Sequence, residues 1–328
     1  MTSSNSRKTP KITLICGGVG GTKLAEGFYH SKYRESLKII GNVADDQEFH
    51  GLWVSPDIDT LTYTLAGVID TKQGWGRKGD SQQTLASLRK LGVDTWMFLG
   101  DKDFATHIFR TELRKKGVSA SKIARKIAKK LKVTVPIILP TDSIIQTQIK
   151  TDEGWLFFQD YFVKKRCEPE ILDIRVQGIA SAKATSESLT AISEADLIVI
   201  APSNPMVSIS PIINIPGIKK ALLNTKAQVV AVSPFFSGTT IKGPADKMMF
   251  SMGFENSNAG LSKFYQGIIN TLVIDESDAQ DISKIKIPHF SMHSMNTLMR
   301  NRNDKTNLAN SLVSLMMSSH QQRDNFHD

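Results

Sequence analysis

The sequence predicts an α/β fold built on a doubly wound, mostly parallel sheet. Short apolar runs recur along the chain, and each ends in Gly, Asp, Ser, Asn or Pro. Segments with the apolar spacing of helices separate these runs, which is typical of parallel strands joined by helices. The 328 residues, of which 40% are hydrophobic and 22% charged, are enough for one large domain of this Rossmann-like type.

The chain divides into a short tail, one domain and a C-terminal helix. Residues 1–10 are polar and lack the apolar centre of a signal peptide, so we expect a flexible tail. Residues 11–304 form the domain. An antiparallel hairpin and helical insertion is expected at about 133–180, because two strand-like runs, at 144–149 and 155–163, flank the turn residues Thr151–Gly154. Residues 305–328 carry one helix with Met and Leu side chains and then become polar.

The domain begins with a strand at 12–16 and a helix from about Thr22 to Tyr33. A second strand at 37–43 is followed by a short loop that carries Trp53. The residues Ser55–Asp57 then mark a helix start, because a capping residue, a proline and an acid follow one another.

Further strands are expected at 95–99, 196–201, 228–232 and 271–275, and we expect the last of these to be the final strand. In open parallel sheets, ligands bind beyond the carboxyl ends of the strands. This rule would bring the glycine-rich segment after the first strand close to polar residues that follow the others. These residues are Asp45, Asp46, Asp101, Asp103, Ser203, Asn204, Ser233 and Gly238.

The glycine-rich segment contains Gly17, Gly18, Gly20 and Gly21, and Thr22 and Lys23 follow. Glycines between a strand and a helix let backbone N–H groups approach an anion, and the helix N-terminus and the lysine add positive charge. The spacing matches neither the dinucleotide fingerprint, which needs glycine at position 23, nor a Walker A loop, which needs glycine at position 22. The segment therefore predicts phosphate binding and leaves the type of ligand open.

Four acids, Asp45, Asp46, Asp57 and Asp59, lie within fifteen residues. Carboxylates beside a phosphate site suggest Mg²⁺, which takes one or two carboxylates together with water and phosphate oxygens. Such an ion would neutralise the charge on a diphosphate leaving group. The alternative is that these acids only cap a helix or a turn. We treat all four as candidate metal ligands and expect Asp46 and Asp59, the later member of each pair, to act in catalysis.

His107 and Arg110 are three residues apart and share a helix face. Arg110 could bind a phosphate, and His107 could contact an acidic or phenolic group, although a lone histidine is more often structural. Ser203 and Ser233 follow strands, but neither lies in a G-x-S-x-G motif. The H-E-x-x-H and Cys/His zinc patterns are also absent from the sequence. Neither a nucleophilic triad nor a zinc site is expected.

The net charge of +9 arises almost entirely in residues 111–132, which hold nine basic residues and one acid. Ile123, Ile127 and Leu131 recur every four residues, which predicts an amphipathic helix at about 119–131 with a basic outer face. This face lacks interleaved aromatic residues, so a solvated surface is favoured over nucleic-acid binding.

The cysteines and the apolar runs bear on the cellular compartment. The two cysteines lie outside any CxxC pair, and no apolar run reaches the length of a membrane span. We expect a cytoplasmic protein that binds neither nucleic acid nor membrane.

A set of short motifs occurs in order along residues 11–280: Gly17–Lys23, Asn42–Asp46, Pro56–Thr60, Leu99–Asp103, Thr106–His107, Arg110–Thr111, Phe158–Gln159, Phe162–Val163, Pro202–Pro205, Ser208–Ile209, Val232–Pro234 and Lys242–Pro244. This ordered set resembles the 2-phospho-L-lactate transferase (CofD) family of deazaflavin coenzyme F(420) biosynthesis. No single motif carries the resemblance.

The resemblance implies a phosphotransferase reaction. Members of the family transfer the phospholactyl group of lactyl-2-diphospho-5′-guanosine to the ribityl 5′-hydroxyl of the deazaflavin FO, release GMP and require Mg²⁺. They are homodimers as a rule. Phosphoryl transfer depends on positioning and charge neutralisation, which agrees with the missing triad. The acid of the donor stays open among lactate, enolpyruvate and glycerate.

The resemblance also implies roles for single residues. The segment Gly17–Lys23 would cradle the donor diphosphate. Asp46 and Asp59 would bind Mg²⁺ or orient the ribityl hydroxyl, with Asp45 and Asp57 as neighbours, and replacement of Asp46 by asparagine would abolish transfer. The residues expected to face the deazaflavin or the transferred phosphate are Thr60, His107 and the catalytic candidate Arg110. Those expected on the guanosine side are Ser203, Asn204, Ser233 and Gly238.

Three other readings remain open at this point. The first is a regulatory nucleotide-sugar-binding relative without transferase activity, which should not bind FO. The second is a dehydrogenase with Asp45 on the ribose, against which Lys23 argues because it replaces the last glycine of the fingerprint. The third is a nucleic-acid protein that acts through residues 111–132, which would show salt-sensitive binding.

Overall fold

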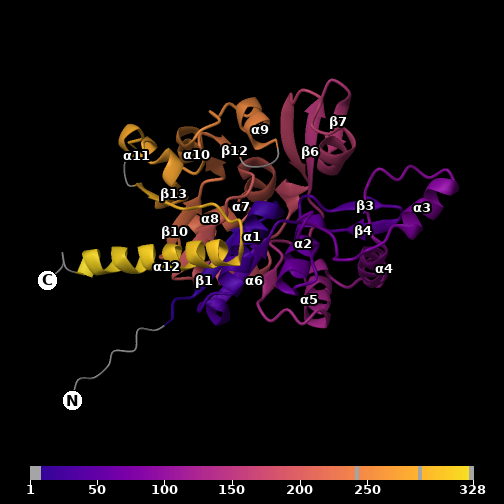
Figure 1. Ribbon diagram of the computed structural model, residues 1–328, viewed down its shortest axis with the longest axis horizontal. Helices are drawn as coiled ribbons and strands as arrows, with labels where there is room; N and C mark the ends of the chain where they lie inside the picture. Colours follow the sequence, from indigo (N-terminus) through magenta and orange to yellow (C-terminus); the bar gives the residue numbers. More distant parts are fainter. Residues whose placement is uncertain (1–8, 241–243, 287–289, 325–328) are drawn as a thin grey trace, which may run out of the picture.

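The computed structural model describes residues 9–240, 244–286 and 290–324, so most of the predicted tail and part of the motif Lys242–Pro244 lie outside the described residues. A central sheet contains seven parallel strands, and small antiparallel sheets accompany it (Figure 1). In spatial order, the strands of the central sheet are β14 (Ser291–Met295), β13 (Thr271–Asp275), β10 (Gln228–Val232), β9 (Leu197–Ile200), β1 (Ile12–Cys16), β2 (Leu37–Gly41) and β5 (Ile137–Ile138). The doubly wound α/β fold is confirmed.

Strand β1 lies inside this sheet, between β2 and β9. Ile12 pairs with Leu37 of β2 on one side and with Leu197 of β9 on the other. The chain therefore adds β2 and β5 on one side of β1, then crosses over and adds β9, β10, β13 and β14 on the other. This change of direction between β1 and β9 is the topological switch point at which such sheets bind ligands.

Helices cover both faces of the sheet, because right-handed crossovers on the two sides of β1 place their helices on opposite faces. The Thr13 hydroxyl donates to the Ala191 carbonyl oxygen (2.7 Å) and so joins β1 to one of these helices, α6. The helices are α1 (Gly18–Tyr29), α2 (Pro56–Leu65), α3 (Gln83–Lys90), α4 (Asp101–Lys115), α5 (Ala120–Lys130), α6 (Ser186–Ser193), α7 (Ser210–Ile213), α8 (Ile218–Leu223), α9 (Ala245–Ser251), α10 (Asn258–Phe264), α11 (Asp281–Lys284) and α12 (Arg302–Asp324). Within the described ranges, no helix is both long enough and apolar enough to cross a bilayer.

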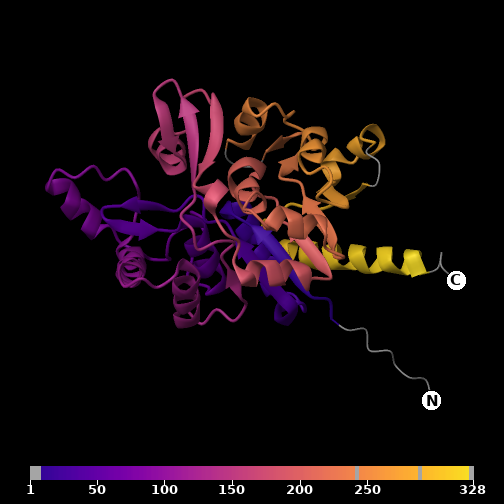
Figure 2. The same ribbon diagram turned by 180° about the vertical axis from the view of Figure 1, so that it is seen from behind.

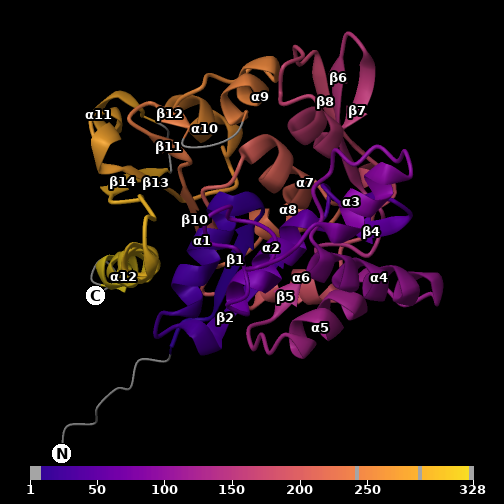
Figure 3. The same cartoon turned by 45° about the vertical axis from the view of Figure 1, so that its right-hand side comes forward.

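Helix α12 packs along α1 and then projects from the body of the molecule (Figure 1). Figure 3 shows the same helix nearly end-on. Its Lys305 forms an ion pair with Glu26 of α1 at 2.5 Å. Figure 2 shows that α3 and α4 lie at the opposite end of the molecule from α12.

The predicted antiparallel hairpin is present. Strand β6 (Gln146–Thr151) pairs with β7 (Gly154–Phe157), and β8 (Asp173–Gln177) adds on the other side of β6. After β7 the chain forms a helical turn at Asp160–Lys164 instead of a strand that continues to Val163. Strand β5, which lies within the range predicted for the insertion, pairs with β2 in the central sheet.

The prediction of a strand at 95–99 is wrong. This stretch pairs with no strand, and its Trp96 and Met97 pack against a second apolar cluster that contains Phe49 and Leu85. The run is apolar because it fills this small core and lines a cavity. The loop predicted around Trp53 is instead a hairpin formed by β3 (Gln47–Phe49) and β4 (Leu52–Val54).

The prediction that 271–275 is the last strand is also wrong, because β14 follows it at the edge of the sheet. The sequence of β14 is Ser-Met-His-Ser-Met, and none of its side chains is fully buried. An edge strand of this composition lacks the apolar run by which the inner strands are recognised in a sequence.

Candidate active site

A cavity of about 510 Å³ lies beyond the carboxyl ends of β1, β2, β9 and β10. Most residues that the sequence predicted for a site line this cavity. They are Gly17, Gly18, Gly20, Lys23, Asp45, Asp57, Asp59, Thr60, His107, Ser203, Asn204 and Ser233. The predicted residues that do not line it are Gly21, Thr22, Asp46, Arg110 and Gly238. The cavity thus occupies the position where the sheet topology places a ligand.

The glycine-rich segment forms the first turn of α1. The helix begins at Gly18, whereas the sequence predicted a start near Thr22. Gly18 adopts a φ of 63°, which a glycine reaches without strain. A Cβ at Gly20 would lie 2.4 Å from the carbonyl oxygen of Pro202, so only glycine lets α1 approach the loop after β9 this closely. The first N–H groups of a helix have no partner within it, and this turn can therefore donate to an anion in the cavity.

Ser203 braces this turn. Its hydroxyl donates a hydrogen bond to the carbonyl oxygen of Gly17 (2.7 Å) and accepts one from the Gly17 N–H (3.3 Å). Thr22 is directed back into the helix, because its hydroxyl donates to the carbonyl oxygen of Gly18 (2.9 Å). Both hydroxyls are used to hold the protein's own backbone.

The other residues predicted on the guanosine side also have partners within the chain. The Asn204 side-chain amide contacts the sulfur of a methionine in α9, and the Ser233 hydroxyl donates to Asn258 (2.7 Å). The Gly238 N–H donates to the carboxylate of Asp278 (2.9 Å). Asn204 and Ser233 line the cavity, whereas Gly238 does not.

Asp45 and Asp57 form a pair of neighbouring carboxylates at the cavity. The Asn42 side chain donates to Asp57 (3.0 Å), while Oδ1 of Asp45 is buried without a hydrogen-bond partner. Burial raises the pKa of both carboxyls, and the charge of Asp57 raises the pKa of Asp45 further. A divalent cation would satisfy the unpartnered oxygen and relieve the repulsion between the two charges. Asp45 and Asp57 therefore fit Mg²⁺.

No three His, Cys, Asp or Glu side chains among the described residues converge closely enough to hold a metal ion on their own. Mg²⁺ does not need three, because it completes its shell with phosphate oxygens and water. The other two candidate ligands are each held through one oxygen: Asp59 accepts from Arg110, and Asp46 accepts from Ser55. Their second oxygens, Oδ2 of Asp59 and Oδ1 of Asp46, are buried without a hydrogen-bond partner.

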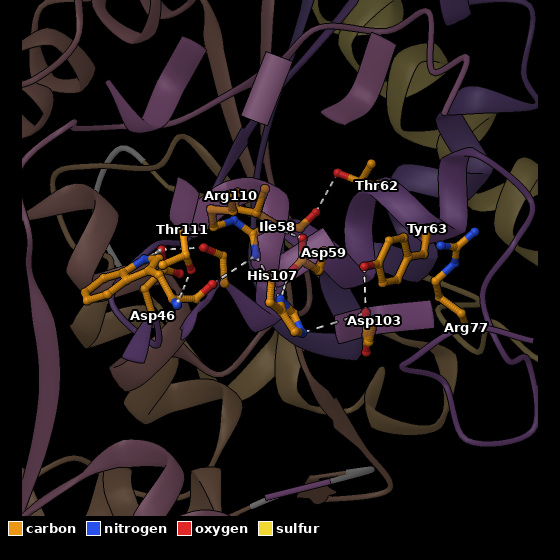
Figure 4. A network of polar contacts seen from close by, with 12 residues as sticks. Asp46, Ile58, Asp59, Thr62, Tyr63, Arg77, Asp103, His107, Arg110 and Thr111 are labelled. Atoms are coloured by element: carbon orange, nitrogen blue, oxygen red, sulfur yellow. Dashed lines mark hydrogen bonds and ion pairs between the residues drawn. The ribbon is translucent and has the colours of Figure 1, made fainter. Parts of the chain in front are cut away.

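A second polar network joins α2 to α4 (Figure 4). Arg110 donates through Nη2 to Asp59, and its Nη1 lies 3.1 Å from Nδ1 of His107. The Tyr63 hydroxyl donates to Oδ1 of Asp103 (2.6 Å), and this oxygen lies 3.9 Å from Nε2 of His107. All except Arg110 line the cavity.

Burial sets the protonation states in this network. It lowers the pKa of His107 to about 4, and the charge of Arg110 acts in the same direction. Burial and the charge of Asp59 raise the pKa of Asp103 to about 6. For Arg110, burial lowers the pKa, but the charge and hydrogen bond of Asp59 outweigh it and raise the value overall. At neutral pH the network thus contains a neutral imidazole beside a charged guanidinium.

Asp46 faces away from the large cavity. Its Oδ2 accepts from the Ser55 hydroxyl (2.7 Å) and from the indole N–H of Trp53 (3.1 Å). It lines a small separate cavity together with Arg110 and Arg114. Burial raises its pKa to about 7, although the Ser55 hydrogen bond acts in the opposite direction. The contacts of Asp46 fasten the β3–β4 hairpin to the start of α2.

The apolar wall of the cavity was not predicted as part of the site. It includes Trp75 and Phe98, which meet edge to face at 5.1 Å, and Phe158 and Phe162, which stack at 5.4 Å. Trp75 stands between two glycines, Gly74 and Gly76, and this isolated aromatic was the available signal. Planar walls of this kind suit a flat ring.

The segment Thr297–Arg300, just before α12, also lines the cavity. The backbone N–H and the hydroxyl of Thr297 both donate to Asp275 at the end of β13, at 2.9 Å each. No motif in the sequence pointed to this segment.

The sequence model of the family described as 2-phospho-L-lactate transferase CofD matches residues 12–310. The chain belongs to the CofD family. It is 35% identical to the 2-phospho-L-lactate transferase of Methanococcoides burtonii over 93% of this chain and 99% of that protein. The corresponding enzyme of Methanocaldococcus jannaschii is 36% identical, with coverage of 92% and 97%.

Other similar proteins extend this comparison. A phosphoenolpyruvate transferase of Streptomyces griseus is 34% identical over 84% of this chain and 89% of its own length. A crystal structure of a UPF0052 family member from Bacillus halodurans has the same fold, with a TM-score of 0.61, 14% identity and coverage of 93% and 99%. As a CofD-family member, the chain is a transferase of coenzyme F(420) biosynthesis.

Proposed function

We propose that this CofD-family transferase moves a phospholactyl group, or a closely related phospho-acid group, from lactyl-2-diphospho-5′-guanosine to the ribityl hydroxyl of FO and releases GMP. One observation carries the proposal. A single cavity combines the N-terminus of α1, the neighbouring carboxylates of Asp45 and Asp57, of which Asp45 has an unpartnered oxygen, and an aromatic wall. A diphosphate donor and a flat acceptor ring need these features next to each other.

On the donor side, the first turn of α1 would bind the diphosphate. Its backbone N–H groups are unpaired within the helix, and Lys23 lines the same cavity. Asp45 and Asp57, supported by Asn42, would hold Mg²⁺ beside it. When bound, the ion would neutralise the negative charge that develops on the leaving phosphate.

On the acceptor side, the apolar wall would hold the deazaflavin ring so that the ribityl chain extends toward the glycine turn. The ribityl oxygen would form a bond to the phosphorus that carries the lactyl group, and its hydroxyl proton would leave to water. The bond from this phosphorus to the bridging diphosphate oxygen would break, and GMP would leave with that oxygen. Asp59 and Thr60 line the cavity between the two sides and would orient the hydroxyl. Arg110 fixes Asp59, so its expected catalytic contribution would come through that carboxylate.

Fluorescence titration with FO, with and without GDP and Mg²⁺, tests the proposal. We expect saturable binding of FO that GDP and Mg²⁺ strengthen, followed by turnover when the complete donor is supplied. The mass of the product identifies the acid, which is relevant because the relatives include a phosphoenolpyruvate transferase. Absence of FO binding under every condition would favour a regulatory nucleotide-sugar binder instead.

We also propose a homodimer that acts in the cytoplasm. Sedimentation of the purified chain would test the oligomeric state, and a monomer that turns over at the full rate would refute the dimer as a requirement.

A further inference from the structure

Among the described residues that line the cavity, Asp45, Asp59 and His107 each carry a buried polar atom without a hydrogen-bond partner, and the nitrogen of His107 is the only potential donor of the three. His107 is 1% exposed and lines the cavity, and its Nε2 is unpartnered. A buried polar group that makes no hydrogen bond costs free energy, so such groups in native proteins normally meet a ligand or an ordered water. The atom is therefore a candidate for direct ligand contact.

The geometry around His107 shows which hydrogen it carries. Nη1 of Arg110 lies 3.1 Å from Nδ1, and a guanidinium can only donate. Nδ1 must accept, so the proton of the neutral ring is on Nε2. The nearest carboxylate oxygens, Oδ2 of Asp59 and Oδ1 of Asp103, are 3.8 Å from Nδ1 and 3.9 Å from Nε2, which is too far for hydrogen bonds. His107 thus presents an unused Nε2–H donor.

An acceptor is fixed beside this donor. Oδ1 of Asp103 accepts from the Tyr63 hydroxyl at 2.6 Å, which holds the carboxylate in place at the cavity. Its distance of 3.9 Å from Nε2 leaves room for one ligand edge to contact both groups (Figure 4). A ring carbonyl next to a ring N–H offers the matching acceptor and donor.

We propose that His107 and Asp103 together bind the –C(=O)–NH– edge of a planar heterocycle whose faces lie against the aromatic wall. The carbonyl oxygen accepts from Nε2–H, and the ring N–H donates to the carboxylate. The inference rests on the proposed function, which supplies two rings with this edge: the pyrimidinedione of FO and the guanine of the donor. His107 and Asp103 then determine specificity for the ring.

The test measures the dissociation constants of FO, by fluorescence, and of GDP with Mg²⁺, by calorimetry. The variants are His107→Leu, His107→Gln and Asp103→Ala, with His30→Gln and Asp152→Asn as matched controls outside the cavity. We expect His107→Leu to weaken one of the two ligands about tenfold or more, because it leaves a ligand carbonyl unpaired. His107→Gln keeps an N–H donor and should recover part of the loss. Thermal unfolding of each variant identifies any that do not fold.

An FO analogue methylated at the imide nitrogen separates the two contacts. The wild type should bind the methylated analogue about tenfold or more weakly than FO. Asp103→Ala should bind the two ligands about equally, since the carboxylate that accepts from the imide N–H is already absent. A matching result with N1-methyl-GDP would assign the site to guanine.

The outcomes distinguish this inference from the proposed function. A loss confined to FO assigns the edge to the deazaflavin, and a loss confined to GDP assigns it to guanine; both support the inference. Binding of both FO and GDP that neither the variants nor methylation of either ligand changes would overturn the inference and leave the proposed function intact. A wild type that binds GDP through His107 but never binds FO would keep the inference and refute the proposed function. Binding of neither ligand would refute both.

Discussion

Asp45 and Asp46 are neighbours in the sequence, yet their carboxylates face different cavities. Asp45 lines the large cavity with an unpartnered oxygen, whereas Asp46 is held by Ser55 and Trp53 beside the small one. The two residues lie in a turn in which the Asp46 N–H donates to the Val43 carbonyl oxygen (3.3 Å), and only Asp45 of the two lines the large cavity.

This difference predicts unequal effects of the two amide substitutions. Asp45→Asn should lower kcat/KM about 100-fold or more, because it removes one of the two carboxylates proposed to hold Mg²⁺ beside the diphosphate. Asp46→Asn should retain more than about a tenth of the wild-type value, because asparagine can still accept from Ser55 and Trp53. Product formation at several donor concentrations measures both. An Asp46→Asn protein that unfolds like the wild type but is inactive would support the sequence-based prediction that Asp46 is catalytic.

The Asp59–Arg110 pair predicts a large loss of stability when the arginine is removed. Both side chains are buried, so Arg110→Met would leave an uncompensated carboxylate and should lower the free energy of unfolding by about 3–5 kcal/mol. The control is Arg125→Met, which removes a solvent-exposed pair with Glu187 and should cost at most about 1 kcal/mol. Urea unfolding of both variants gives the comparison, and equal losses would contradict it.

Asp46 should make the stability of the protein depend on pH. Its pKa is about 7 in the folded chain and near the ordinary 3.8 in the unfolded chain, so the folded state binds the proton more tightly. Its contribution to stability is therefore largest at low pH and decreases as the pH rises from about 4 to about 7. The Asp46→Asn variant has no carboxyl group at this position, so its stability should not show this decrease.

The measurement is the difference in unfolding free energy between Asp46→Asn and the wild type. This difference should move in favour of the variant between about pH 4 and pH 7 and then level off. Other shifted groups, including His107 and Asp103, are present in both proteins and largely cancel. A difference that stays constant over this range would show that folding does not raise the pKa of Asp46.

The basic face of α5 is expected to be a solvated surface. Its lysines are exposed, and its apolar residues Ile123 and Ile127 pack inward. Replacing Lys126, Lys129 and Lys130 together by glutamine should therefore change turnover by less than about twofold, because screened surface charges act weakly at a distance. Filter binding at low and moderate salt measures the affinity of both proteins for DNA and RNA. An affinity that falls steeply with salt in the wild type, and that the triple variant lacks, would indicate a nucleic-acid function.

Sequence patterns located the inner strands and the glycine turn because each has a local cause. β1 and β9 are buried at every position because helices cover both their faces, and all their residues except Thr13 are apolar. Gly20 is required by the close approach of α1 to Pro202. The local sequence pattern could not distinguish a buried strand from the run at 95–99. This run is apolar because it packs into the second apolar cluster, with Phe49 and Leu85.

The site was predictable in part for the same reason. Residues that follow strands, such as Asp45 and Ser203, are brought together by the sheet topology alone. The opposite orientation of Asp46, the wall formed by Trp75 and the contribution of Thr297–Arg300 depend on contacts between distant segments. No spacing within the sequence encodes such contacts.

The enclosure of the cavity has a consequence for biosynthesis on the ribosome. The glycine turn is translated near the start of the chain, but Thr297–Arg300 and α12, which packs on α1, come near its end. A chain stalled before residue 297 would contain the glycine turn but lack Thr297–Arg300, which line the cavity, and α12, which packs on α1. We therefore expect the enclosed cavity to be complete only after the C-terminal residues have been translated.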